Sequence, residues 1–131
     1  IDAAIDRNPR DRKKMAVINS GRAATSHYRL IQRLPGTSYV EVSLESGRTH
    51  QIRVHMTHIG YPIVGDLLYG RGPIKQKGLP PTAVEAVNGF PRQALHARTL
   101  KLIHPENGET CEFHAPLADD INDLIEVLKD A

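Results

Sequence analysis

The sequence lacks the features of disulfide-rich, membrane-spanning and secreted proteins. Cys111 is its single cysteine, so no disulfide can form within the chain and no cluster of cysteines can hold a metal. No apolar run approaches the roughly 18 residues that a membrane-spanning helix needs. The first residues have neither the basic nor the apolar region of a signal peptide. We therefore expect a cytoplasmic protein with no membrane segment. Because the chain does not begin with methionine, we also expect it to be processed or part of a longer chain.

Charge is nearly balanced overall but unevenly distributed. The 131 residues, enough for one compact domain, carry 17 Lys and Arg against 15 Asp and Glu. Residues 7–14 are strongly basic, whereas residues 119–130 are acidic. The basic segment is either a solvated, mobile leader or an arm that contacts phosphates, because clustered cations are typical of nucleic-acid binding. Its cations are Arg7, Arg10, Arg12, Lys13 and Lys14.

The first part of the chain is predicted to contain a β-hairpin. Residues 1–22 show little periodicity and are expected to form an extended lead-in. Residues 24–34 and 38–45 alternate as strands do, and a Pro-Gly pair between them predicts a turn. One face of the first strand would carry Tyr28, Leu30 and Leu34. The second strand would point Val40, Val42 and Leu44 inward.

A change of period predicts a helix over residues 49–59. Ile52, Met56 and Ile59 recur at helical spacing and are expected to face the core. Gly60, followed closely by a proline, ends the helix. Residues 70–92 are rich in glycine and proline and predict a long surface loop, with a short helix near residues 83–87.

The last third is predicted to add a second hairpin and a terminal helix. Residues 93–104 and 109–114 form the strands. Residues 119–130 place apolar side chains at helical spacing on one face, namely Ile121, Leu124, Ile125 and Leu128. The expected fold class is therefore α+β, with mostly antiparallel strands and flanking helices.

The densest group of polar residues is Gly-Arg-Thr-His-Gln-Ile-Arg at residues 47–53. Gly47 would allow a sharp turn from strand to helix, and the first amides of the helix would attract an anion. Arg48 could add a planar cationic clamp beside them, and Arg53 lies one turn further along. The alternative is an ordinary helix start with solvated arginines.

Seven histidines raise the question of a metal site. Of His50, His55 and His58, only the last two are close neighbours on a helix, and no His-Glu-x-x-His motif occurs. No Gly-x-Ser-x-Gly motif is present either. A metal site is therefore not expected, although a small metal-dependent hydrolase stays as a minor alternative.

The chain resembles the pseudouridine synthases of the RluA/RluD type, which modify uridines in ribosomal RNA. The resemblance rests on residues 44–56 and on their continuation through 60–70. Shorter matches lie at residues 11–17, 24–29, 92–97 and 114–117, in the order that the family shows. The lead-in is most similar to the RluD branch, which acts on the large ribosomal subunit.

The resemblance implies a fold, a reaction and a site. The fold is a mixed, mostly antiparallel sheet with helices around an RNA-binding cleft, and residues 1–131 would be the C-terminal portion of the catalytic domain. The reaction isomerises uridine to pseudouridine in large-subunit (23S) ribosomal RNA without cofactor or metal. Arg53 would pair with the catalytic aspartate. RNA contacts are expected from Arg12, Lys13, Lys14, Arg48, Thr49, His50 and Gln51.

One part of the family pattern is missing. The catalytic aspartate belongs to a His-Arg-Leu-Asp segment that does not occur in these 131 residues. Asp66 is expected to be exposed in a turn, away from Arg53, and so cannot replace it. The partners would be ribosomal RNA and the missing N-terminal half, with possible self-association of the fragment. The alternative function is a non-catalytic RNA-binding module.

Overall fold

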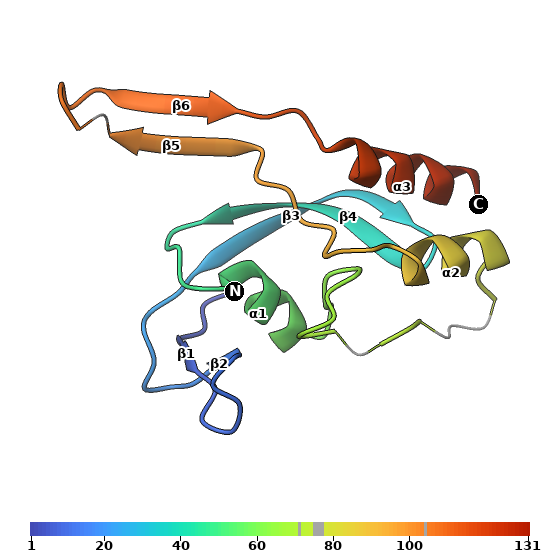
Figure 1. Cartoon of the computed structure of the whole chain (residues 1–131), viewed down its shortest axis with the longest axis horizontal. Coiled ribbons are helices and arrows are strands. Elements are labelled where there is room, and N and C mark those ends of the chain that lie inside the picture. The colour runs from blue at the N-terminus through green and yellow to red at the C-terminus, as the bar shows by residue number, and fades with distance from the viewer. Residues whose placement is uncertain (71, 75–77, 104) are drawn as a thin grey trace.

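The computed structural model describes residues 1–70, 72–74, 78–103 and 105–131. It confirms the α+β class, with antiparallel strands and helices along the whole chain (Figure 1). The strands form three antiparallel pairs, β1 with β2, β3 with β4 and β5 with β6. In chain order the elements are β1 (Ile5–Arg7), β2 (Met15–Val17), β3 (Ser26–Leu34), β4 (Thr37–Leu44), α1 (Gln51–His58), α2 (Pro81–Asn88), β5 (Thr99–Ile103), β6 (Thr110–His114) and α3 (Asp119–Asp130).

The lead-in is folded, which corrects the prediction of an extended or mobile leader. β1 and β2 pair in antiparallel register, with Ile5 opposite Val17. Ile5 is 1% exposed and packs with Ala24 and Val54 in a small core. The prediction failed because strands of three residues are too short for an alternation of apolar and polar residues to be recognised. Backbone pairing between β1 and β2 could not be read from the sequence.

β3 and β4 form the expected hairpin, and Gly36 takes the left-handed conformation at its turn. The predicted inward faces were wrong in part. Tyr28 and Leu30 are 51% and 44% exposed, and Leu44 is 45% exposed. A bulge between Leu30 and Gln32 breaks the alternation of β3, because an extra residue shifts later side chains to the other face.

α1 forms where it was predicted, and Met56 is buried as expected, but the rest of the predicted core face is not. Its buried residues are Gln51, Val54, His55 and Met56, whereas Ile52 and Ile59 are only half-buried. The helix packs against β2 and β3, and polar side chains fill much of that contact. The spacing of apolar residues cannot identify this buried face of α1, because Gln51 and His55 are buried through hydrogen bonds.

A second core lies between α2 and α3. Ala83 and Val87 of α2 pack against Leu124 and Leu128 of α3, and the buried face of α3 is the one that was predicted. The short helix predicted near residues 83–87 is confirmed, because α2 occupies residues 81–88. The basic residues of that segment, Arg71, Lys75 and Lys77, lie outside the described residues.

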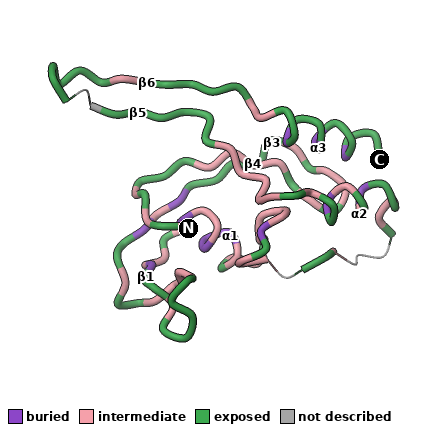
Figure 2. Tube along the Cα trace, in the orientation of Figure 1, coloured by how far each residue is buried: buried purple, intermediate pink, exposed green. Residues whose placement is uncertain are grey.

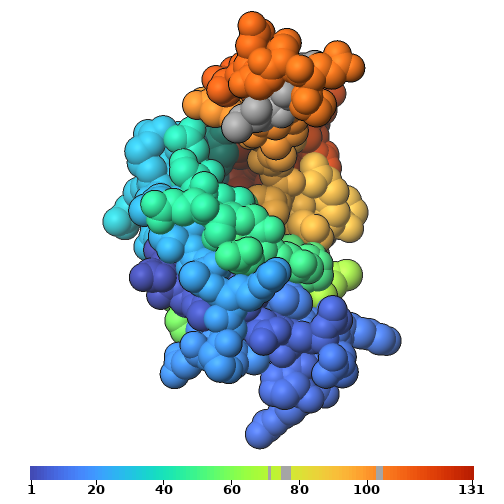
Figure 3. All heavy atoms as spheres, turned by 90° about the vertical axis from the view of Figure 1, so that its left-hand side faces the viewer, coloured from blue at the N-terminus to red at the C-terminus, as the bar shows by residue number. Residues whose placement is uncertain are grey.

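The two hairpins β1–β2 and β5–β6 lie at opposite ends of the molecule (Figure 3). β5 starts at Thr99, later than expected, because residues 93–98 run along the body of the protein without strand pairing. β5 and β6 are exposed almost throughout the residues that Figure 2 colours, and Leu100 and Phe113 are 57% and 56% exposed. Within the described residues, no helix is both long and apolar enough to cross a membrane.

Candidate active site

The entry to α1 is shaped by a histidine rather than by a glycine. His50 precedes the helix with φ 55° and ψ 23°, the left-handed conformation, and it is the one non-glycine with positive φ in the described part of the chain. Gly47 does not adopt a positive φ, so the sharp turn into the helix does not depend on a glycine at this position. Non-glycine residues in this conformation carry strain and concentrate at functional sites.

Gln51 organises the loop that carries Arg48. Its Oε1 accepts hydrogen bonds from the Arg48 amide at 3.0 Å and from the Ser46 hydroxyl at 2.8 Å. Its Nε2 donates to the carbonyl of Thr25 at 3.0 Å and to the hydroxyl of Ser26 at 2.9 Å. Because Gln51 is 3% exposed, its amide serves the protein interior. Gln51 was expected to contact RNA, and in the structure it is almost wholly buried while it borders the groove described below.

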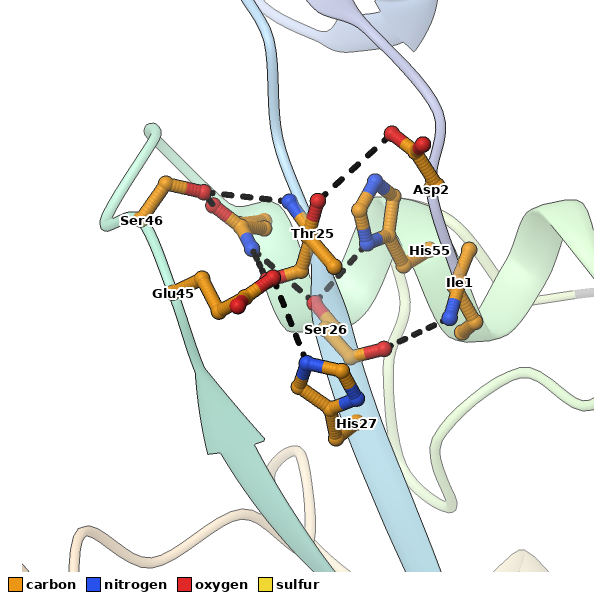
Figure 4. A network of polar contacts seen from close by, with 9 residues as sticks. Ile1, Asp2, Thr25, Ser26, His27, Glu45, Ser46 and His55 are labelled. Atoms are coloured by element: carbon orange, nitrogen blue, oxygen red, sulfur yellow. Dashed lines mark hydrogen bonds and ion pairs between the residues drawn. The ribbon is translucent and has the colours of Figure 1, made fainter.

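A buried histidine continues the same network (Figure 4). His55 Nε2 lies 2.8 Å from the carbonyl of Ala3, and Nδ1 lies 2.8 Å from Ser26 Oγ. Since a carbonyl can only accept, Nε2 carries the proton and Nδ1 accepts from the Ser26 hydroxyl. Both side chains are buried, 0% and 1% exposed, so this serine and histidine stabilise the fold and cannot attack a substrate.

Arg53 and Asp66 form the central ion pair of the site. Arg53 Nε and Nη2 each donate to one carboxylate oxygen of Asp66 at 2.9 Å. The amides of Leu68 and Tyr69 also donate to Asp66 Oδ1, at 3.1 Å each. The prediction that Asp66 is exposed and away from Arg53 was wrong, because its side chain is 0% exposed. The tight turn after Gly65 folds Asp66 back onto α1, which sequence spacing could not show.

These contacts set the charge state of the pair. Burial alone would raise the pKa of Asp66, but hydrogen bonds from Arg53 and from the amides of Tyr69 and Leu68 hold that pKa below its ordinary value. The hydrogen bond to Asp66 raises the pKa of Arg53. Both groups are therefore ionised, and the carboxylate oxygens of Asp66 are occupied by hydrogen bonds from within the protein.

Tyr69, which sequence reasoning missed, joins the site to the N-terminal hairpin. The Arg53 guanidinium lies over its ring at 5.0 Å from the centroid, a favourable cation–π distance. Its hydroxyl accepts from the Met15 amide at 2.9 Å and lies 2.8 Å from His50 Nδ1. Asp66 and Tyr69 both lie in the segment 60–70, which carried part of the family resemblance. That resemblance is the feature of the sequence that could have pointed to these two residues.

A shallow groove of about 470 Å³ lies beside this cluster. One wall comes from the entry of α1 with Arg48, His50 and Arg53, and the other from Gln93 and Leu95. The second wall is held by Arg92, which donates to the carbonyls of Gln93 and Leu95. Arg53 Nη1 has no hydrogen-bond partner within the described residues, so this donor is available to a bound group.

The predicted RNA-contacting cations lie on two segments that contact each other, the β1–β2 hairpin and the entry of α1. Arg12, Lys13 and Lys14 occupy the loop and the edge of the β1–β2 hairpin. The Asn8 side chain caps this loop by accepting from the amides of Arg10 and Asp11. Arg48 and the exposed Thr49 lie at the entry of α1.

Arg48 is anchored close to that hairpin. Its Nε donates to the carbonyl of Ala23 at 2.9 Å, and residues 22–25 pair with the first strand segment through the bridges Asp2–Thr25 and Ile5–Arg22. The other guanidinium donors of Arg48 have no hydrogen-bond partner in the part of the chain that the structure describes. Among the described residues, no group of three or more His, Cys, Asp or Glu is arranged to hold a metal ion.

Comparison with known proteins gives a consistent result. The sequence profile of the RNA pseudouridylate synthases matches residues 1–58. Ribosomal large subunit pseudouridine synthase D of Xanthomonas campestris is 51% identical over 129 residues, which cover 98% of this chain and 39% of that protein. The proteins of the same name from Pseudomonas aeruginosa and Escherichia coli are 48% and 44% identical, and the match covers 40% of each. The chain thus spans about two fifths of the length of these relatives.

A solved structure supports the same fold. Human RNA Pseudouridylate Synthase Domain Containing 1 matches all of this chain and 59% of its own, with a TM-score of 0.67 and 24% sequence identity. At that identity the likeness concerns the fold alone. Together with the sequence matches along nearly the whole chain, it shows that this chain is similar, over its length, to part of the RNA pseudouridine synthases.

Proposed function

We propose that the chain is the C-terminal portion of the catalytic domain of a synthase that converts uridine to pseudouridine in large-subunit ribosomal RNA. The observation that carries this proposal is the position of Arg53, fixed by Asp66 and Tyr69 at the edge of a groove, with one donor still free. Its proposed role is to bind and orient a catalytic carboxylate. We further propose that the protein acts on ribosomal RNA in the cytoplasm.

The carboxylate is proposed to come from outside these 131 residues. The isomerisation breaks the bond between the sugar and N1 of uracil and forms one to C5, so a carboxylate must reach the sugar–base junction. Asp66 is unsuited to this task, because its oxygens already accept four hydrogen bonds and its side chain is buried. An N-terminal half of the domain is therefore the proposed partner. The apolar side chains exposed on β3 to β6 are consistent with such docking or with self-association.

RNA binding is proposed to use the cations beside the groove. Arg12, Lys13 and Lys14 of the hairpin would contact phosphates, and Arg48 would extend the same surface to the groove. His50 lines the groove itself, and the exposed Thr49 lies next to it in the chain. Gln51 would act indirectly, because it holds the Arg48 amide from inside the protein.

The test measures tritium release from C5-labelled uridine in 23S ribosomal RNA. The chain alone should release none, and the chain combined with the N-terminal half of a relative should release tritium. Arg53→Lys should lower that release strongly, because lysine cannot reproduce the planar fork that binds Asp66. As a matched control, Arg29→Lys alters an exposed strand arginine and should leave release unchanged. Turnover by the chain alone, or full activity of Arg53→Lys, would contradict the proposal.

The alternative is an RNA-binding module without chemistry. The folded basic hairpin favours it, since this surface needs no carboxylate to bind phosphates. RNA binding with no tritium release after the N-terminal half is added would support this second function. A metal-dependent hydrolase has no support from the geometry of the described histidines.

A further inference from the structure

We propose that His50 is a neutral hydrogen-bond donor that recognises a carbonyl oxygen of the target base through Nε2. This inference rests on the proposed function and specifies how the groove distinguishes a base from the phosphates around it. His50 lines the groove together with Arg48 and Arg53. Unlike these two arginines, it can present a donor without a charge.

The tautomer follows from the partners of Tyr69. The Tyr69 hydroxyl oxygen accepts from the Met15 amide at 2.9 Å, which leaves the hydroxyl proton to be donated. The acceptor within reach is His50 Nδ1, at 2.8 Å. Nδ1 is then unprotonated, and the proton of the neutral ring lies on Nε2.

The surroundings keep the ring neutral and hold it in place. Burial and the positive charge of Arg53 both lower the pKa of His50, although Asp66 opposes them. The ring meets Tyr69 edge to face, with centroids 5.5 Å apart and planes at 79°. The left-handed backbone of His50 directs the chain into α1 while the side chain stays on Tyr69. These contacts restrict the imidazole before any ligand arrives.

Nε2 has no partner among the described residues, so its proton is free to be donated. A neutral donor matches an uncharged carbonyl oxygen, whereas a phosphate forms stronger, charge-assisted hydrogen bonds with the neighbouring Arg48 guanidinium. The chemical class of the ligand is therefore a pyrimidine base with its carbonyl oxygens, such as uracil. Contact with a phosphate is the competing outcome.

The first experiment observes the tautomer directly. Nitrogen-15 NMR of the chain at neutral pH should show His50 with protonated Nε2 and unprotonated Nδ1. Tyr69→Phe removes the hydroxyl, so the Nδ1 signal should shift and His50 should titrate at higher pH than in the wild type. A ring with protonated Nδ1, or one that is charged at neutral pH, would overturn the inference.

The second experiment separates base from phosphate recognition. The probes are two single-stranded oligoribonucleotides of one sequence, the first with a single uridine and the second with an abasic site there. His50→Ala should weaken binding of the uridine RNA by about threefold to tenfold, the range of one neutral hydrogen bond. Binding of the abasic RNA and the salt dependence should not change. His58→Ala, an exposed histidine on the same helix, is the matched control and should bind like the wild type.

The remaining outcomes each decide the question. Equal losses on both RNAs, with a smaller salt slope, would mean that His50 contacts a phosphate and would overturn the inference. Wild-type binding by His50→Ala while Arg48→Ala still binds weakly would overturn it and leave the proposed function intact. A complete lack of RNA binding by the wild type combined with the N-terminal half would contradict both proposals.

Discussion

Two Arg–Asp pairs with the same fork geometry stabilise this chain in different environments. Arg53–Asp66 is buried, with side chains 13% and 0% exposed, whereas Arg92–Asp120 is open to solvent at 41% and 44%. Solvent screens the second pair but not the first. The comparison separates the effect of burial from that of hydrogen-bond geometry within one protein.

Asp66→Asn should therefore cost much more stability than Asp120→Asn. Removing one partner of a buried pair leaves an uncompensated charge, at a cost of about 3–5 kcal/mol. The exposed pair should contribute far less, because solvent screens its charges. Urea unfolding of both variants measures the difference. Equal losses would show that Asp66 is not an interior anchor for Arg53.

Acid should remove the contribution of Asp66 to the stability of the folded protein. Its pKa is lowered in the folded state from an ordinary value of 3.8, so the stabilisation is fully present above that value. It is lost as the pH falls through the folded pKa, because the carboxyl then takes up a proton. The difference in stability between wild type and Asp66→Asn should stay constant from about pH 7 to about pH 5 and shrink in stronger acid. A difference that grows on acidification would contradict this assignment.

At the scale of elements, the groove depends on how two connecting segments meet. Gly65 precedes Asp66 with φ 78°, and a Cβ there would clash with the carbonyl of Arg92. The amide of Ala94 donates to the carbonyl of Val64 at 2.8 Å beside this contact. The chain that carries Asp66 and the wall that carries Gln93 thus pack backbone to backbone.

Gly65→Ala should be strongly destabilising, with Gly108→Ala as a matched control. Both glycines have positive φ, but a Cβ at Gly108 would meet open space. The control should lose only the backbone strain of about 1–2 kcal/mol, and Gly65→Ala should lose clearly more. Thermal unfolding of the two variants makes the comparison. Similar losses would mean that the two segments can separate without cost.

The network around Gln51 makes α1 dependent on polar contacts. Gln51→Ala would leave the Arg48 amide without its acceptor, and would remove one of the partners of the Ser46 and Ser26 hydroxyls. Each unsatisfied buried group costs about 1–3 kcal/mol. We expect lower stability together with weaker RNA binding, because the Arg48 loop loses its support. Full stability with weak RNA binding would instead indicate a direct contact of Gln51 with RNA.

At the scale of the whole molecule, the cations are gathered although the net charge is only +2. The β1–β2 hairpin and the entry of α1 are joined through Tyr69 and through the contact of Arg48 with Ala23. Cations that are far apart in the sequence therefore lie on neighbouring segments, and such a surface binds phosphates even when total charge is nearly balanced.

RNA affinity should consequently fall steeply with salt. Each single-strand phosphate contact contributes about 0.7 to the slope of log affinity against log salt. Neutralising Lys13, Lys14 and Arg48 together should therefore lower the slope by about 2. Lys101→Gln and Lys129→Gln, at the far end of the molecule, serve as the control. An unchanged slope in the triple variant would exclude this surface as the phosphate site.

Local patterns along the chain were sufficient for much of the architecture. The turn at Gly36, helix α1, the exact span of α3 and its buried face all follow from periodicity and turn residues over short stretches. Each of these features is decided by neighbours within a few positions. The motif at residues 47–53 likewise drew attention to Arg53 before any contact was known.

Tertiary structure decided which residues form the site. Asp66 meets Arg53 across 13 positions and Tyr69 meets Met15 across 54, and no local period encodes such distances. The buried face of α1 was misjudged for the same reason, since Gln51 and His55 are buried by hydrogen bonds to distant strands rather than by apolarity. Spacing reports local geometry, whereas burial of a polar group depends on partners that only the folded chain brings together.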